Sequence, residues 1–251
     1  MSWIAPRPIA MPDALFENPR LAAIYDHLDP DRSDLDVYAD MIEEFGASSV
    51  LDVGCGTGTF CCLLSLKGTR VVGLDPAEAS LAVARAKPGA DRVCWIHGDV
   101  RSLPRLQIDV VTMTGNVAQV FLTDQEWEST LQALRSALRS GGRLIFETRD
   151  PAKQAWLGWN RRETYQRVDV PEFGPVQSWN EVTDVSGEMV SFRGTVVFDV
   201  DGAVLRSYST LRFREREEVV RSLVDAGLEV EEIRDAPDRP GRELVFIARR
   251  T

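Results

Sequence analysis

The chain has 251 residues, of which 44% are hydrophobic and 27% charged, a size and composition typical of one large globular domain or of a domain that carries an insertion. Its 39 acidic and 29 basic residues give a formal net charge of -10, which argues against a surface that follows a nucleic-acid backbone. Arg161, Arg162 and Arg167 lie close together in the sequence, but we interpret them as part of a solvated strand or loop.

The sequence predicts neither an export signal nor a membrane span. The N-terminal stretch MSWIAPRPIAMPDALF has prolines where a secretory signal needs an unbroken apolar run, and about 18 apolar residues never occur in succession. The four cysteines, at positions 55, 61, 62 and 94, include no CxxC pair, so they favour neither a zinc site nor a disulfide framework. We expect buried thiols, no bound metal and a cytoplasmic location.

Helical stretches alternate with short apolar runs through the first 150 residues. We expect helices over 20–28 and 34–45, the second with Asp34 as its N-cap and Gly46 just past its end. Alternating strands and helices indicate βαβ crossovers and a mostly parallel sheet. The other elements expected here are strands over Ser49–Val53, 70–74, 93–96, 108–113 and 143–147, a helix from the glycine-rich turn to Leu66, a helix over 77–87, and a helix over 124–139 that is capped by Thr123 or Asp124 and ended by Gly141-Gly142.

Between Pro151 and Arg214 the pattern changes to strands joined by tight turns, without helices. The connections Ser186-Gly187 and Asp201-Gly202 are typical of two-residue hairpin turns, and the segments between them are rich in Val, Phe, Tyr and Thr. This region therefore predicts an antiparallel meander of three or more strands. The expected strands are 176–185, 188–200 and 203–214, and a helix over 215–226 with strands over 228–234 and 243–249 then completes the first sheet.

The expected fold class is α/β: a doubly wound, mostly parallel, seven-stranded sheet of the Rossmann-like kind with an inserted antiparallel β lid. Residues 1–150 and 215–251 are expected to form the main domain, with residues 1–47 as a helical cover. Residues 151–214 are expected to form the lid. The lid leaves the sheet at the carboxyl end of the fifth strand, which is the edge where doubly wound folds bind ligands.

The most informative stretch is VLDVGCGTGTF, residues 50–60, where a buried strand runs into a turn of three glycines, Gly54, Gly56 and Gly58. Glycines let a ligand approach the backbone, and the following helix offers unpaired N–H groups. Dinucleotide-binding folds use a similar turn, but their third glycine would fall at Thr59. Asp52, two residues before the turn, would repel a pyrophosphate and could meet the ammonium of a bound amino acid.

Two more acidic residues follow the next two strands. Asp75 comes about 20 residues after the glycine turn, where a carboxylate can accept hydrogen bonds from both ribose hydroxyls of an adenosine. Asp99, in the segment HGDV, could accept a hydrogen bond from the amine of adenine. Together with Asp52 they predict a site for ribose, adenine and an amino-acid tail, without a phosphate clamp.

Residues 49–147 resemble the core of the class I S-adenosylmethionine-dependent methyltransferases. VLDVGCGTG is similar to the first motif of that family, GLDPAEASLAVAR to the second and HGDV to the third. IDVVTMTGNVAQVF resembles the strand and loop that flank the transferred methyl, and LRSGGRLIFET the fifth-strand segment. Five motifs in the family's order over a hundred residues make this resemblance specific.

The resemblance implies that S-adenosylmethionine is the cofactor. It implies contacts from the Gly54 backbone to the methionine part, from Asp52 to the amino group, from Asp75 to ribose and from Asp99 to adenine. The other positions that it assigns to the cofactor are Gly56 in the turn, Pro76 and Ala77 near adenine, Val100 at the adenine ring, Met113 and Thr114 after the fourth strand, and Tyr25 and Tyr38 over the methionine carboxylate. For the two tyrosines, an ordinary packing role stays open.

Methyl transfer from a sulfonium is an in-line displacement, in which the protein aligns the acceptor and excludes water. Because a general base is optional for many acceptors, we expect no obligatory catalytic triad, and the catalytic residues stay unassigned. His27, two residues after Tyr25, is a weak candidate for a base that faces the acceptor, whereas His97 at a strand end suits a structural role.

The lid, 151–214, is expected to decide which acceptor binds. Relatives that modify small molecules often carry a lid at this position, so the resemblance favours a small-molecule acceptor over nucleic acid or a membrane. Some lid side chains could instead pack the small sheet or a homodimer interface. The candidate pocket residues are Trp156, Trp159, Tyr165, Trp179, Phe192, Tyr208, Arg161, Arg193 and Arg206.

The sequence thus predicts a methyltransferase with a small-molecule acceptor. Two alternatives stay open: a non-catalytic protein that binds adenosylmethionine and regulates a partner, and a nucleotide-dependent oxidoreductase on the same doubly wound fold.

Overall fold

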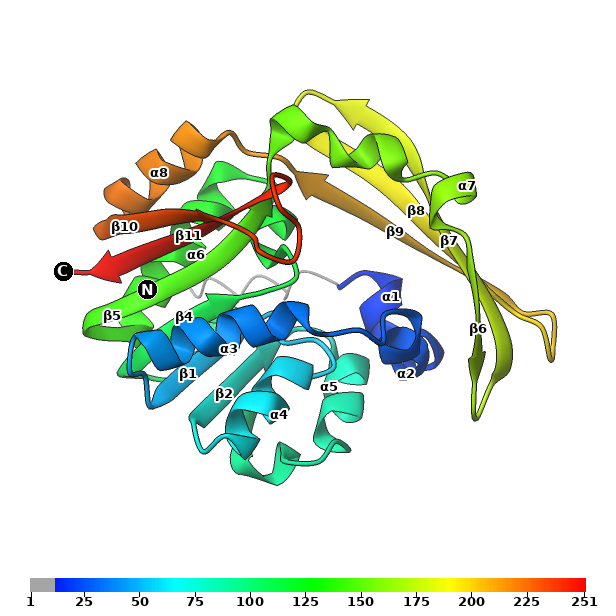
Figure 1. Ribbon diagram of the computed structural model, residues 1–251, viewed down its shortest axis with the longest axis horizontal. Helices are drawn as coiled ribbons and strands as arrows, with labels where there is room; N and C mark the ends of the chain where they lie inside the picture. The colour runs from blue at the N-terminus through cyan, green and yellow to red at the C-terminus, as the bar shows by residue number, and fades with distance from the viewer. Residues whose placement is uncertain (1–11) are drawn as a thin grey trace, which may run out of the picture.

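Seven strands form the larger of two sheets, in the order β10-β11-β5-β4-β1-β2-β3. In the computed structural model, which describes residues 12–251 (Figure 1), β1 to β5 run parallel and β11 runs antiparallel to both of its neighbours. The strand order reverses between β1 and β4, which makes their carboxyl ends the expected ligand-binding edge. The strands are β1 (Ser49–Val53), β2 (Arg70–Asp75), β3 (Val93–His97), β4 (Ile108–Met113), β5 (Leu138–Arg149), β10 (Leu228–Asp235) and β11 (Glu243–Arg250).

Helices cover both faces of this sheet, as the doubly wound prediction requires. On one face, α3 (Asp34–Glu44) and α4 (Thr59–Leu66) bury apolar side chains against alternate residues of the strands, such as Val50 and Ile145. On the other face, α6 (Asp124–Ala137) and α8 (Arg216–Asp225) pack against the residues between them, such as Leu51 and Phe146. Figure 1 shows the first pair in front of the sheet and α6 behind it. Successive side chains along each strand point to opposite faces of the sheet, so alternate residues contact different helices.

The second sheet is the predicted lid, an antiparallel meander of four strands in the order β6-β7-β8-β9. The hairpin turns at Gly187 and Gly202 are confirmed, with φ of 58° and 67°. The strands are β6 (Gln166–Val170), β7 (Gly174–Ser186), β8 (Met189–Phe198) and β9 (Val204–Arg212).

The first part of the insertion is helical, and the expectation of strands alone was wrong there. Three short helices precede the meander, and polar side chains cap the first and the third of them. Asp150 accepts a hydrogen bond from Ala152 N at 3.0 Å, and Asn160 accepts one from Glu163 N at 3.2 Å. The helices are η4 (Pro151–Lys153), η5 (Ala155–Gly158) and α7 (Arg161–Thr164).

Two N-terminal helices, α1 (Ala14–Glu17) and α2 (Pro19–Leu28), lie between the large sheet and the lid (Figure 1). Leu21 and Ile24 of α2 are fully buried against a lid cluster that includes Val176, Val196 and Phe198. The N-terminal helices therefore contribute part of the apolar core of the lid. Residues 1–11 of the predicted cover lie outside the described residues.

Two predicted helix boundaries were wrong. Ser33, not Asp34, occupies the N-cap of α3, and Asp34 is the first helical residue, paired with Arg32 at 3.1 Å. Helix α6 ends at Ala137, before the glycine pair 141–142, which lies within β5. The β4–β5 register shifts between Ile108 and Val110, opposite this part of β5, and Gly141 has a φ of 77°. The glycines thus shape a strand irregularity instead of ending a helix.

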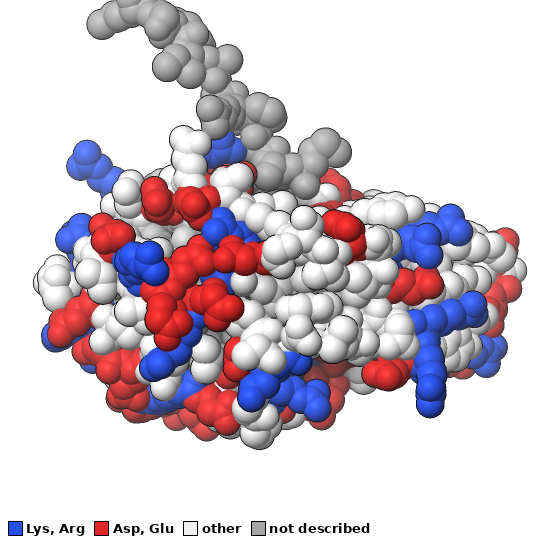
Figure 2. Space-filling model, turned by 90° about the horizontal axis from the view of Figure 1, so that it is seen from above, with Lys and Arg blue, Asp and Glu red and all other residues white. Residues whose placement is uncertain are grey.

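Acidic and basic side chains are intermingled on the described part of the face seen in Figure 2. Ion pairs also connect neighbouring strands of the large sheet, for example Arg249 of β11 with Glu229 of β10 at 2.8 Å. Among the described residues, no helix has both the length and the apolar composition that crossing a bilayer requires.

The capping box of α6 provides a test of local stability. Thr123 Oγ1 accepts a hydrogen bond from Glu126 N at 3.2 Å, and Glu126 Oε2 accepts one from Thr123 N at 3.1 Å. We expect Thr123→Ala to lower the free energy of unfolding by about 1 kcal/mol in urea titrations. Ser33→Ala is the control, because Ser33 makes no side-chain cap bond to α3. Equal losses in the two variants would contradict this account.

Candidate cofactor and acceptor site

The glycine turn connects the end of β1 to α4 in a left-handed conformation, with φ of 71°, 52° and 74° at Gly54, Gly56 and Gly58. Gly54 N donates a hydrogen bond to Leu74 O at 2.8 Å, which fixes the turn against β2. A Cβ on Gly58 would lie 2.5 Å from Trp95 Cη2, whereas one on Gly56 would meet nothing within 4 Å. Gly56 is therefore the position where a ligand can approach the backbone.

Asp75 joins the glycine turn to the segment that follows β2. Its carboxylate accepts hydrogen bonds from Gly56 N at 2.7 Å and from Ala77 N at 2.8 Å. The residue is buried, and burial raises the pKa of the carboxyl although both hydrogen bonds act in the opposite direction. The structure thus brings three predicted cofactor positions, Gly56, Asp75 and Ala77, into one hydrogen-bonded group.

Asp52 lies beneath the turn, with only 2% of its surface exposed. Thr112 Oγ1 donates a hydrogen bond to it at 2.8 Å, and the Cys61 thiol lies 3.5 Å away. Burial raises the pKa of Asp52 to about 7. A cation brought close to this carboxylate would lower its pKa again, as an ammonium partner would.

The carboxylate of Asp99 interacts with Arg101. It caps the short helix η2 (Val100–Ser102), accepting a hydrogen bond from Arg101 N at 2.9 Å, and its side chain pairs with the Arg101 guanidinium. These hydrogen bonds lower the pKa of Asp99. To accept a bond from adenine as predicted, the carboxylate would have to share its lone pairs with Arg101. Nearby, His97 Nε2 lies 3.0 Å from Pro76 O.

The N-terminal candidates occupy different environments. Tyr25 packs against the Phe16 ring, with 5.6 Å between centroids, and burial raises its pKa. Tyr38 is 5% exposed on α3, where burial, then the charge of Glu147 and a hydrogen bond to that carboxyl raise the pKa of the tyrosine. His27 is exposed on the last turn of α2, a placement that does not favour a base facing the acceptor.

A buried polar group at the ends of β4, β5 and β11 was missed at the level of sequence. It consists of Asn116, Glu147, Arg149 and Glu243, and we call it the Glu147 cluster. Asn116 has a φ of 62°, and its N–H donates to Glu147 Oε1 at 2.5 Å. Its side-chain nitrogen donates to Glu243 Oε1 at 3.2 Å. A signal was present in LIFET, because a glutamate within a buried apolar strand is unusual.

Two aromatic side chains of the lid, Trp156 and Trp159, lie on the side of the lid that faces the Glu147 cluster. Trp159 packs edge-on against Phe192 with 4.9 Å between ring centroids. The Arg149 guanidinium lies 5.4 Å from the Trp159 ring centroid. Trp156 packs edge-on against Phe213, at 4.6 Å. These contacts bring two predicted pocket residues, Trp156 and Trp159, next to the end of the large sheet.

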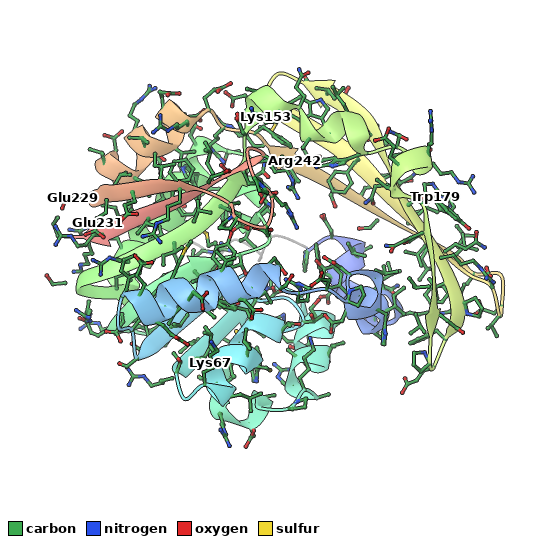
Figure 3. The ribbon with its side chains drawn as sticks, viewed as in Figure 1. Lys67, Lys153, Trp179, Glu229, Glu231 and Arg242 are labelled. Carbon is green, nitrogen blue, oxygen red and sulfur yellow. The ribbon has the colours of Figure 1, made fainter. Side chains whose placement is uncertain are left out.

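Trp179 and Arg193, which the sequence offered as pocket residues, face the other way. Both bond Glu181 Oε2, at 2.9 Å and 2.8 Å, on the sheet face opposite Val196, which packs on α2. Figure 3 shows Trp179 on the far side of the molecule from the large sheet. Alternation along a strand separates the two faces but does not say which one turns inward.

Comparison with known proteins identifies the domain. Residues 50–142 match the model of a methyltransferase domain family. The cypemycin N-terminal methyltransferase of a Streptomyces species is 36% identical over 118 residues, 45% of this chain and 47% of that protein. The sugar N-methyltransferase KedS8 from Streptoalloteichus has a TM-score of 0.74 at 19% identity, covering 100% of this chain and 99% of that one. Residues 50–142 therefore form a domain of the methyltransferase type, and the whole chain shares the fold of S-adenosylmethionine-dependent methyltransferases.

A structure solved with the cofactor has the same fold. CalS10, an amino pentose methyltransferase from Micromonospora echinaspora solved with S-adenosylmethionine, has a TM-score of 0.67 at 24% identity over 88% of this chain and 93% of CalS10. At such identities the likeness shows the fold. The chain spans about half the length of the first curated relatives that it matches. The predicted fold class, with its seven-stranded sheet and β lid, is confirmed.

The buried charge of Asp52 predicts how stability depends on pH without ligand. Its folded pKa of about 7 lies above the unfolded value of about 3.9, so the folded state holds the proton more tightly and loses stability as pH rises from about 4 to 7. We expect Asp52→Asn to gain stability relative to the parent over this range, by about 4 kcal/mol at most.

Urea titrations at several pH values measure this difference. Asp109→Asn is the opposite control, because hydrogen bonds from Ser48, Ser49 and Arg139 hold the pKa of Asp109 well below its usual range. The free energy of unfolding that Asp109→Asn loses relative to the parent should stay constant from pH 5 to 8, because the Asp109 carboxyl is ionised in both the folded and the unfolded state over this range. A pH-independent effect of Asp52→Asn would refute the assignment.

Proposed function

We propose that this protein transfers a methyl group from S-adenosylmethionine to a small-molecule acceptor by in-line displacement. The observation that carries the proposal is the open approach at Gly56, beside the carboxylate of Asp75 and above the buried Asp52. Two carboxylates beside a turn that a ligand can approach suit a ribose and an ammonium, and their charges would repel a pyrophosphate. These residues therefore fit adenosylmethionine better than a dinucleotide.

Each residue has a defined task in this proposal. Bound S-adenosylmethionine supplies a methyl group on a positively charged sulfur, which an acceptor atom takes over. Asp75 holds the ribose, Asp52 faces the amino group, and the turn at Gly54 and Gly56 lies against the methionine part. The further cofactor positions proposed are Tyr25, Tyr38, Pro76, Ala77, Asp99, Val100, Met113 and Thr114.

The acceptor is proposed to bind between the lid and the carboxyl edge of the large sheet, where Trp159 approaches Arg149. The lid and the N-terminal helices would keep water away from the transfer. Neighbouring folds support a small acceptor, because KedS8 is named a sugar methyltransferase and CalS10 an amino pentose methyltransferase. A non-catalytic, cofactor-binding regulator is the alternative, and it would bind adenosylmethionine without any turnover.

Calorimetry tests the cofactor assignment. We expect S-adenosylhomocysteine to bind in the micromolar range, at about -8 kcal/mol, and more tightly than NAD. Asp75→Asn removes the charge that strengthens hydrogen bonds from the ribose hydroxyls, so binding should weaken by about 2 kcal/mol. The amide oxygen of the variant can accept from only one of the two backbone donors, Gly56 N or Ala77 N, so urea titration has to show that the variant folds. Tighter binding of NAD than of S-adenosylhomocysteine by the parent protein would contradict the assignment of S-adenosylmethionine as cofactor.

A matched pair of lid variants tests the acceptor site. Trp159→Ala removes an inward ring, so it should lower kcat/KM for any methylated acceptor by about tenfold, or about 1.4 kcal/mol. Trp179→Ala removes an outward ring and should leave kcat/KM nearly unchanged. Both variants should bind S-adenosylhomocysteine within about threefold of the parent, in keeping with an acceptor role.

Sedimentation of the same two variants measures their oligomeric state and so tests the alternative that the meander is a homodimer interface. If Trp179→Ala alters the oligomeric state and Trp159→Ala leaves acceptor turnover intact, the meander serves as a dimer surface and the lid assignment fails.

A further inference from the structure

The Glu147 cluster contains two buried oxygen atoms that need a hydrogen-bond donor. Asn116 and Glu147 are each 2% exposed. Asn116 Nδ2 is directed at Glu243, which leaves the amide oxygen free, and the Asn116 N–H occupies only Oε1 of Glu147. Within residues 12–251, Asn116 Oδ1 and Glu147 Oε2 have no hydrogen-bond partner of standard geometry, although the Tyr38 hydroxyl of α3 also interacts with the Glu147 carboxyl. Buried polar atoms in native proteins are nearly always paired, so both atoms indicate a ligand that donates hydrogen bonds.

The charges of the cluster leave Glu147 without a cation. Arg239 pairs with Glu243 at 2.9 Å, and Arg149 Nε lies 3.7 Å from the same carboxylate. Arg149 also donates a hydrogen bond to Gln119 Oε1 at 2.9 Å. No ion pair to Glu147 forms within the described part of the chain, and burial raises its pKa to about 7. The carboxyl is therefore able to hold or release a proton near neutral pH.

The cluster lies beside the proposed cofactor site. Val117 directly follows Asn116, and a Cβ on Gly54 would come within 2.5 Å of Val117 Cγ2. The first glycine of the turn is thus in contact with the residue next to Asn116. On the other side, Arg149 approaches the ring of Trp159 in the lid. The two free oxygens consequently belong to the region between the cofactor turn and the inward face of the lid.

We propose that the methyl acceptor is an amine, and that Glu147 Oε2 and Asn116 Oδ1 hold its nitrogen. The inference rests on the proposed function and names its substrate class. An amine can donate two N–H groups, one to each free oxygen, whereas a hydroxyl can donate only one. An acceptor carboxylate would be repelled by Glu147. The charged form of Glu147 also favours an ammonium ion on binding.

The transfer is balanced with Glu147 as the proton acceptor. The bound ammonium ion first passes one proton to Glu147 Oε2, which leaves the neutral amine. The lone pair of the amine forms the bond to the methyl carbon, and the carbon–sulfur bond breaks with its electrons left on sulfur. The product nitrogen carries a positive charge and leaves as an ammonium ion, and the proton on Glu147 then returns to water.

The test uses two probes of the same shape on the full chain loaded with S-adenosylhomocysteine: cyclohexylamine, which is an ammonium ion at pH 8, and cyclohexanol. Thermal shift and NMR titration measure binding without turnover. We expect the amine to bind at least tenfold more tightly than the alcohol. Glu147→Gln should abolish that preference, because its amide group has no charge, while S-adenosylhomocysteine affinity stays within about threefold.

Glu231→Gln is the matched control. It removes a carboxylate that pairs with Arg143 on the opposite side of the large sheet from the lid (Figure 3), so it should keep the tenfold preference for the amine. Equal binding of the two probes to the parent protein, absence of binding by both included, would overturn the proposal even if Glu147→Gln failed to fold. A preference that survives in folded Glu147→Gln would also overturn it. Failure of S-adenosylhomocysteine to bind would reject the proposed function itself.

Discussion

The carboxylate of Asp75 ties together the two backbone segments on which the proposed site depends. Its hydrogen bonds to Gly56 N and Ala77 N hold the glycine turn against the start of the chain that leads to α5 (Glu78–Arg85). Both donors belong to the backbone, so one side chain determines how two loops meet. Burial opposes the charge of Asp75, and the two hydrogen bonds offset only part of that cost. A third hydrogen bond, donated by a ligand hydroxyl, would further stabilise the charged form of Asp75.

The N-terminal helices depend on this arrangement in turn. Thr57 in the glycine turn donates a hydrogen bond to Asp26 of α2 at 2.6 Å, and Lys87 pairs with the same carboxylate at 2.6 Å. The other side of α2 packs into the lid, where Arg20 lies 3.6 Å from the Phe198 ring centroid. One short helix therefore contacts both the proposed cofactor turn and the sheet proposed to cover the acceptor.

The sequence was sufficient for features that depend on local pattern. The strand–helix alternation, the glycine turn and the hairpin turns at Gly187 and Gly202 follow from period, glycine content and turn chemistry, and the structure contains all of them. The residues assigned to the cofactor stay predictions, although the structure joins Gly56, Asp75 and Ala77 by hydrogen bonds.

Features that depend on distant pairing escaped the sequence. Asn116 and Glu147 meet because β4 and β5 pair, and Glu243 joins them because β11 returns antiparallel to β5. No local sequence pattern indicates these contacts. The inward and outward faces of the lid were likewise assigned wrongly for Trp179, since alternation is symmetric until a partner such as α2 is known. Gly141 was misread because a glycine pair suits a helix end and a strand irregularity equally well.

The shared core between α2 and the lid has a consequence for protein engineering. Residues 151–214 look like a separable module in the linear sequence, yet Leu21 and Ile24 complete the apolar layer beneath Val176 and Phe198. A graft of the meander alone onto a related scaffold would expose that layer to water and invite aggregation. A chimera designed to exchange acceptor specificity therefore has to carry the α2 segment, 19–28, together with the meander as one discontinuous unit.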